Sequence, residues 1–148
     1  MPPRIPAILE THAVADTGAT LVFIMTGTPM TNIHPATHPL TINLPDGRVV
    51  KSTHVCDMVI PSLPTVLEGH IVPDLQVASL LGICILCKAR CIVVFFDMAC
   101  YVKYKGKVIL TGSKDPSTDL WTLPITPAAI TQNAYQGGQW TAQGESLP

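Results

Sequence analysis

The chain has 148 residues, of which 47% are hydrophobic and only 13% are charged, and its net charge is −1. A chain of this length and composition can bury the apolar core of one domain. The near-neutral charge argues against general electrostatic binding to nucleic acid or to anionic membranes, and no apolar run approaches the roughly 18 residues that span a bilayer.

The first part of the chain predicts an extended arm, two short strands and a loop. Residues 1–7 contain three prolines, which favour an extended arm. Residues 8–15 predict a strand that ends at Asp16, and the apolar run 21–25 predicts a buried strand or turn. Residues 26–39 are rich in Thr, Pro, Asn and His and predict a loop.

The middle of the chain predicts a β-hairpin. Residues 40–44 alternate between apolar and polar side chains, as a strand with one solvated face does. Residues 45–48 follow as a turn with Asp46-Gly47 at its tip, a sequence typical of hairpin turns. Strand character then resumes over 49–60.

The second half predicts further strands and one short helix. Stretches with the apolar or β-branched composition of strands are 91–96, 101–105, 107–111 and 120–125, and 65–72 predicts a strand that is interrupted at Glu68-Gly69-His70. The segment near 82–89 alone has helical character. After Thr126 the chain becomes polar and rich in Gly and Gln, which predicts a flexible tail or linker over 126–148. The folded domain is therefore expected to span 8–125.

The five cysteines are an odd number without the spacing of a small disulfide scaffold, so we interpret them as reduced thiols of a cytoplasmic protein. The N-terminus also lacks the apolar core of a signal peptide. The low charge and the few aromatic residues indicate that a partner covers part of the apolar surface.

The most informative stretch is the turn after the first strand: Asp16, Thr17, Gly18, Ala19 and Thr20. A strand that ends in an acid on a tight turn holds the carboxylate at a fixed place. Glycine permits backbone conformations and close approaches that other residues do not. The stretch resembles the Asp-Thr-Gly active-site turn of aspartic proteases. Because short motifs recur by chance, an ordinary turn after a strand is the alternative.

The order of the later segments extends this resemblance. The strand that ends in Asp-Gly at 43–47, the Val-Pro-x-Leu segment at 72–75 and the run Leu80-Leu81-Gly82 follow the turn in that order. Together they resemble retroviral-type aspartic proteases, and more closely the proteases of copia-type LTR retrotransposons. The resemblance covers roughly residues 8–125. It implies an all-β, retropepsin-like acid-protease barrel with a flap hairpin and one short helix near 82–89.

The resemblance also implies an activity, which is cleavage of a retrotransposon polyprotein inside a cytoplasmic particle by a homodimeric aspartic endopeptidase without a cofactor. Each subunit would supply one catalytic Asp16, because no other aspartate of the chain is followed by Thr-Gly. Thr17 would bond across to the partner turn, and Gly18 would line the substrate channel. The flap residues would fold over the peptide: Leu44, Pro45, Asp46, Gly47, Arg48 and Val49. Leu80, Leu81 and Gly82 would pass beside the active-site loop.

Three departures from the family pattern bear on these expectations. Asp16 lies close to the N-terminus, so the first hairpin of the viral enzymes, whose terminal strands help join the subunits, is short or missing. Ile83-Cys84 stand where viral enzymes often have Arg followed by Asn or Asp. The chain also continues well past the helix, and these extra strands are candidates for the subunit interface.

Other patterns have simpler explanations. Cys84-x-x-Cys87 is a possible redox or metal pair, but no second ligand pair follows, so buried thiols are favoured. His34 and His38 have the spacing of a helical metal pair, but the neighbouring prolines favour solvated loop histidines. The lysines at 103, 105 and 107 are expected at an exposed turn rather than in a nucleic-acid site. A non-catalytic or domesticated interaction domain with the protease fold is the alternative function.

Overall fold

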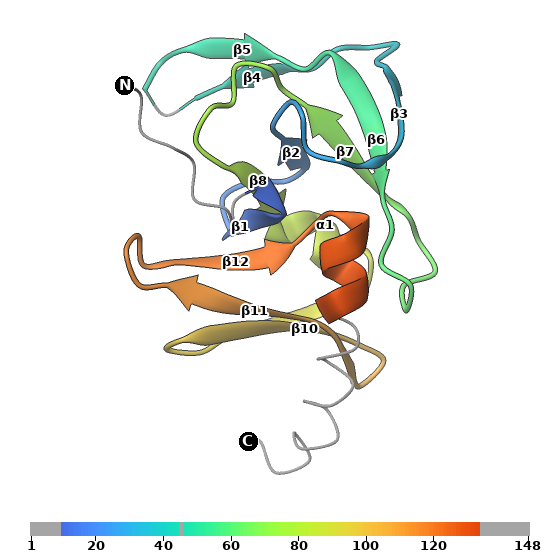
Figure 1. Cartoon of the computed structure of the whole chain (residues 1–148), viewed down its shortest axis with the longest axis vertical. Helices are drawn as coiled ribbons and strands as arrows, with labels where there is room; N and C mark the ends of the chain where they lie inside the picture. Colours follow the sequence, from blue (N-terminus) through green and yellow to red (C-terminus); the bar gives the residue numbers. More distant parts are fainter. Residues whose placement is uncertain (1–9, 45, 134–148) are drawn as a thin grey trace.

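The computed structural model describes residues 10–44 and 46–133, and its strands form one ten-stranded mixed sheet and a separate hairpin (Figure 1). In spatial order the strands of the large sheet are β3 (Thr31–Pro35), β6 (His54–Met58), β7 (Leu67–Ile71), β2 (Val22–Ile24), β8 (Ser79–Gly82), β1 (His12–Asp16), β12 (Leu120–Pro124), β11 (Lys107–Asp115), β10 (Ala99–Tyr104) and β9 (Ile92–Phe95). The separate hairpin consists of β4 (Thr41–Asn43) and β5 (Val49–Lys51). The predicted β-rich class is confirmed.

Strand β1 lies in the interior of the large sheet. It pairs in parallel with β8, with Asp16 opposite Gly82, and antiparallel with β12, with His12 opposite Pro124. Two segments that are far apart in the sequence therefore hold the strand on both edges. This pairing fixes the end of β1, where the polar turn begins.

The chain contains two short helices where the sequence predicts one. The expected helix is α1 (Ile83–Lys88), directly after β8. The second helix covers 127–133, inside the stretch interpreted as a tail. Thr126 Oγ1 accepts a hydrogen bond from the Ala129 amide at 3.3 Å, which caps the start of this helix. Residues 134–148 of the predicted tail, and the predicted arm 1–7, lie outside the described residues.

Tertiary contacts hold the second helix against the sheet. Ile130 is 2% exposed and belongs to the main core. The side chain of Asn133 accepts a hydrogen bond from the Thr111 amide at 2.9 Å and donates one to the Thr111 carbonyl oxygen at 2.7 Å. Both contacts reach a strand more than 20 residues earlier, so the polar composition of the segment alone gave no sign of them.

Three further expectations need correction. Residues 31–35 of the predicted loop form the edge strand β3, with Asn32 at a positive φ of 56°. The long strand expected over 49–60 is divided at the buried Ser52, whose hydroxyl accepts a hydrogen bond from the Leu40 amide at 2.8 Å. Strand β7 continues through Gly69 without interruption, because Gly69 pairs with Cys56 of β6 on one side and with Val22 of β2 on the other. A Cβ at this position would lie 2.6 Å from Ile24 Cδ1, so a glycine fits there.

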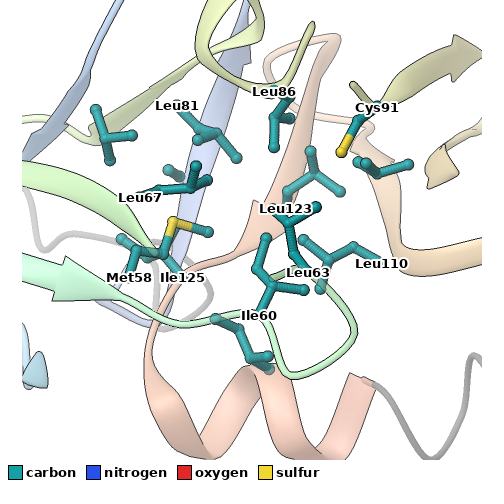
Figure 2. Packing of buried hydrophobic residues seen from close by; sticks show 14 of the residues in the cluster. Met58, Ile60, Leu63, Leu67, Leu81, Leu86, Cys91, Leu110, Leu123 and Ile125 are labelled. Atoms are coloured by element: carbon teal, nitrogen blue, oxygen red, sulfur yellow. The ribbon is translucent and has the colours of Figure 1, made fainter. Parts of the chain in front are cut away.

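The core joins both halves of the sheet. Figure 2 shows Met58 and Leu67 meeting Leu81, Leu123 and Ile125 in one cluster. Each of these side chains is at most 3% exposed, and burying a side chain of this size contributes about 1.5–3 kcal/mol. The strand that carries Asp16 therefore sits on a continuous apolar layer. Within the described residues, no helix is long and apolar enough to cross a membrane.

One buried histidine lies in the first half of the sheet. His70 of β7 is 7% exposed, and its Nε2 lies 3.5 Å from Glu68 Oε1. Its Nδ1 is buried without a hydrogen-bond partner. Burial lowers the pKa of His70 below its ordinary value, and the nearby Glu68 carboxylate opposes part of this effect.

We expect this histidine to make the fold less stable in acid. The folded chain holds His70 neutral, whereas the unfolded chain takes up its proton near the ordinary pKa of 6.5. The contribution is therefore complete above that pH and is lost as the pH falls toward the folded-state pKa. Denaturant titrations at pH 7.5 and 5.5 should show a smaller decrease in unfolding free energy for His70→Gln than for the unmodified chain.

His38→Gln, at an exposed histidine, is the matched control and should retain the full decrease. An identical pH dependence of His70→Gln and the unmodified chain would contradict this role for His70.

Candidate functional site

Asp16 is the last residue of β1, and its side chain organises the turn that follows. Asp16 Oδ1 accepts a hydrogen bond from the Gly18 amide at 2.8 Å, and its carbonyl oxygen accepts one from the Ala19 amide at 3.3 Å. A Cβ at position 18 would lie 3.3 Å from the same Oδ1. The glycine therefore leaves room for the carboxylate to bond back to the turn. This geometry gives the carboxylate of a half-buried aspartate a fixed direction.

The segment Leu80-Leu81-Gly82 lies directly beside this turn. The Gly82 amide donates a hydrogen bond to the Leu21 carbonyl oxygen at 3.0 Å. A Cβ at position 82 would lie 2.6 Å from the carbonyl oxygens of both Ala19 and Leu21. Only a glycine lets the two backbones approach so closely. Leu81 is fully buried beneath the turn, so β8 supports the turn from behind.

The β4–β5 hairpin is closed by a tight turn. The Leu44 amide donates to the Arg48 carbonyl oxygen at 2.8 Å, and Gly47 has a positive φ of 88°. Asp46 accepts hydrogen bonds from the backbone amide of Arg48 at 2.9 Å and from its Nε at 2.7 Å. These bonds lower the pKa of Asp46 below its ordinary value. Pro45, predicted as part of this tip, lies outside the described residues.

The hairpin and the Asp16 turn enclose a space of about 280 Å³, which we call the hairpin hollow. Figure 1 shows β4 and β5 at the top of the molecule, above the half of the sheet that contains β1, β2 and β8. The hollow is lined by Asp16, Gly18, Ala19, Thr20, Phe23, Ile42, Asn43, Leu44, Val50, Val72, Leu75 and Leu80. Its lining is mostly apolar, and Asp16 is the only carboxylate among the described residues that line it.

The sequence-predicted residues divide into four groups in space. Those that line the hairpin hollow are Asp16, Gly18, Ala19, Thr20, Leu44 and Leu80. Asp46, Gly47 and Arg48 form the exposed tip of the hairpin, and Val49 is 58% exposed on its outer face. Leu81 and Gly82 lie behind the turn. Thr17 is exposed and lines a different hollow, together with Phe95 and Trp121.

Several lining residues are absent from the sequence-based prediction. Ile42 and Val50 face each other across the hairpin and point into the hollow, opposite Phe23 of β2. Val50 is 4% exposed, whereas its neighbour Val49 is 58% exposed. The alternation of inward and outward side chains along a strand was the available signal for Ile42 and Val50. Phe23 had no comparable signal.

The other candidate sites do not converge into a cluster. Among the described residues, no three His, Cys, Asp or Glu side chains are placed to hold a metal ion. Cys84 is half-buried and Cys87 is exposed, and both are free thiols. Burial raises the pKa of the Cys56 and Cys100 thiols to about 11. Thiols in such surroundings are poor nucleophiles at neutral pH.

The histidines and lysines singled out in the sequence also lie apart from the hairpin hollow. His34 belongs to the exposed strand β3, where its Nδ1 lies 2.8 Å from the Asn32 carbonyl oxygen. The expectation that it lies in a loop was therefore wrong. Lys105 lies in the turn between β10 and β11, with its Nζ 5.5 Å from the centre of the Tyr104 ring.

The lining of the hairpin hollow indicates which contacts hold the β4–β5 hairpin against the large sheet. No strand of the large sheet pairs with β4 or β5 among the described residues, so apolar contacts such as those of Val50 must hold it down. Burying a valine side chain contributes about 1.5 kcal/mol, and every 1.4 kcal/mol is about tenfold in an opening equilibrium. Val50→Asp should therefore accelerate amide hydrogen exchange in β4 and β5 by about tenfold or more.

Val49→Asp, one residue away on the exposed face, should leave this exchange within about twofold of the unmodified chain. Equal acceleration by both variants, or an acceleration spread over the whole sheet, would contradict a hairpin held by its inner face.

Comparisons with protein-family models, with curated proteins and with solved structures find no match to this chain.

Proposed function

We propose that this chain is a retropepsin-like aspartic endopeptidase, similar to the proteases of copia-type LTR retrotransposons, and that it acts as a homodimer. The observation that carries the proposal is the setting of Asp16. Its carboxylate ends a strand, is followed by Thr17 and Gly18, and lines a hollow beneath a hairpin. A hollow of this kind, with one acid at its floor and a hairpin as its roof, suits an extended peptide.

The strand arrangement supports the retropepsin-like fold as part of this proposal. Gly82 lies opposite Asp16, and α1 follows it directly, as the resemblance implies for the segment beside the catalytic loop. The antiparallel neighbour of β1 is β12, which comes from the other end of the domain. We assign to β12 the role of holding the catalytic strand β1 along its antiparallel edge.

The chemistry requires a second carboxylate. Within residues 10–44 and 46–133, Asp16 is the only carboxylate that lines the hairpin hollow, and a second copy of the chain would supply another Asp16 by two-fold symmetry. Two carboxylates about 3 Å apart share one proton and titrate as a pair. The ionised member takes a proton from a water molecule, and the protonated member gives its proton to the peptide carbonyl oxygen.

The oxygen of that water bonds to the carbonyl carbon and forms a tetrahedral diol. The proton taken from the water then passes to the amide nitrogen, the carbon–nitrogen bond breaks, and a diol proton returns to the pair. The products are a carboxylic acid and an amine, and the pair is regenerated with one proton.

The hairpin supplies the binding part of the mechanism. An extended substrate could add its backbone to the hairpin edge as another strand. Its apolar side chains would then contact Ile42, Val50 and Phe23 in the hollow. By resemblance, the natural substrate is a retrotransposon polyprotein and the compartment is cytoplasmic. Closing the hairpin over the peptide would exclude water other than the attacking molecule.

The direct test is Asp16→Asn, incubated with a proteome-derived peptide library, with new peptide ends identified by mass spectrometry. We expect cleavage by the unmodified chain and a loss of at least about 10³-fold in the variant, because an amide cannot serve as the general base. The control is Asp74→Asn. Asp74 is an exposed aspartate in the loop 73–76, and its side chain does not line the hollow. The cleavage activity of this variant should remain within about twofold of that of the unmodified chain.

The same assay should give an optimum on the acid side of neutrality, and a statine-type transition-state mimic should block it. Cleavage that persists in Asp16→Asn would remove Asp16 from the mechanism.

A non-catalytic interaction domain remains the second candidate function. The observation that favours it is that the described part of one chain places a single carboxylate in the hairpin hollow. A chain that stays monomeric in sedimentation experiments at high concentration, and cleaves nothing in the library, would support this alternative.

A further inference from the structure

A second hollow borders Asp16 on the side away from the hairpin. It has a volume of about 450 Å³ and is lined by Asp16, Thr17, Val14, Phe95, Leu120 and Trp121, together with Ala15. We call it the aromatic hollow. Among the described residues, Asp16 is the only charged one that lines it and the only one that it shares with the hairpin hollow. One carboxylate therefore stands at the boundary between the two spaces.

We propose that the aromatic hollow is the surface on which a second copy of this chain docks. The inference rests on the proposed function, because that function requires two Asp16 carboxylates about 3 Å apart. A two-fold axis must then pass between them, and the surface around the axis in one copy faces the same surface in the other. In the proposed function the peptide binds on the hairpin side of Asp16. Thr17 and the aromatic hollow are then the surface that contacts the second copy.

The chemistry of the hollow suits a protein interface. Leu120 is 45% exposed, and Met98, outside the hollow, is 56% exposed. The Met98 carbonyl oxygen accepts a hydrogen bond from the Lys114 amide at 2.9 Å, and Lys114 Nζ lies 4.8 Å from the centre of the Trp121 ring. An apolar, aromatic centre with charge at its rim is the usual composition of an interface.

The aromatic side chains are held in place before any partner arrives. Trp121 Nε1 donates a hydrogen bond to the Phe96 carbonyl oxygen at 3.0 Å, and the Trp121 ring meets the Phe95 ring edge-on with centroids 5.2 Å apart. Fixed aromatic residues lose little conformational freedom on association. Rigid tryptophans of this kind often contribute most of the energy of an interface.

The surface also connects directly to the candidate catalytic strand. Leu120 and Trp121 belong to β12, which pairs with β1 through the register His12–Pro124, Ala13–Leu123 and Val14–Thr122. A second copy that docks on β12 would therefore have a fixed position relative to β1 and to Asp16. An interface on β3, at the opposite edge of the sheet, lacks this connection.

The test compares Leu120→Glu with the matched control Val66→Glu in the full chain. Val66 is 50% exposed in the loop before β7, so both variants place a charge at a similarly exposed apolar position. Sedimentation equilibrium over a concentration series should show a dimer for the unmodified chain. Leu120→Glu should raise the dimer dissociation constant by about tenfold or more, and Val66→Glu should change it by less than about twofold. Circular dichroism should show that both variants are folded.

A second measurement locates the interface without a charged substitution. The chain has two tryptophans, so Trp140→Phe leaves Trp121 as the sole indole. Dilution through the dissociation constant should then shift its emission to longer wavelength, because dissociation exposes it to water.

The outcomes separate this inference from the proposed function. A chain that is monomeric at the highest concentration, or a dimer insensitive to Leu120→Glu and without the emission shift, would overturn the docking surface even if cleavage is observed. A dimer that Leu120→Glu weakens would support the surface even if the library assay detects no cleavage, and in that case the catalytic proposal alone would fall.

Discussion

The constraint on which the rest of the molecule depends is the pairing of β1 on both of its edges. A strand of five residues has few hydrogen bonds of its own, and here β8 and β12 supply them from two distant parts of the chain. The parallel pairing with β8 sets the register that places Asp16 opposite Gly82. At Gly82 the backbone of β8 approaches the backbone of the turn without an intervening side chain. The position of one carboxylate is thus determined by main-chain geometry rather than by side-chain packing.

Around that fixed point the molecule presents surfaces with different physical character. The large sheet rests on a continuous core, whereas in the described part of the chain the β4–β5 hairpin pairs with no strand of that sheet, and Val50 on its inner face lines the hairpin hollow. The hairpin is therefore the part best suited to open and close. The aromatic surface near Trp121 is held by a hydrogen bond and a ring contact and is suited to rigid docking.

Much of the strand pattern could be predicted because it depends on local signals. The turn at Asp46-Gly47, the β-branched run of β9 and the hairpin at Gly106 each carry their cause in neighbouring residues. The helix 127–133 could not be predicted in this way, because Ile130 and Asn133 acquire their partners only after the chain folds back onto Thr111. The edge strand β3 was missed because its composition resembles that of a loop.

The candidate site was predictable to a similar extent. Residues 16–20 are contiguous in sequence, so they lie close together in space whatever the rest of the fold, and the sequence alone was enough to group them. Phe23 and Val72 join it only because β2 pairs with both β7 and β8. Alternation along the strand indicates that Val49 and Val50 face opposite sides, but which of them points inward depends on how the hairpin packs onto the rest of the chain. The side chains that shape the hollow therefore depend on long-range pairing.

The antiparallel pairing of β1 with β12 has a consequence for how the protein is made. During synthesis the N-terminal strand emerges first, but its antiparallel partner emerges more than 100 residues later. Pairings between such remote segments form slowly, because a long loop must close before any contact compensates for the lost chain entropy. A growing or truncated chain that lacks residues 120–124 leaves one edge of β1 open. Strand β1, which carries Asp16, therefore gains its antiparallel partner only after residues 120–124 have been translated, so the Asp16 turn is held on both sides late in synthesis.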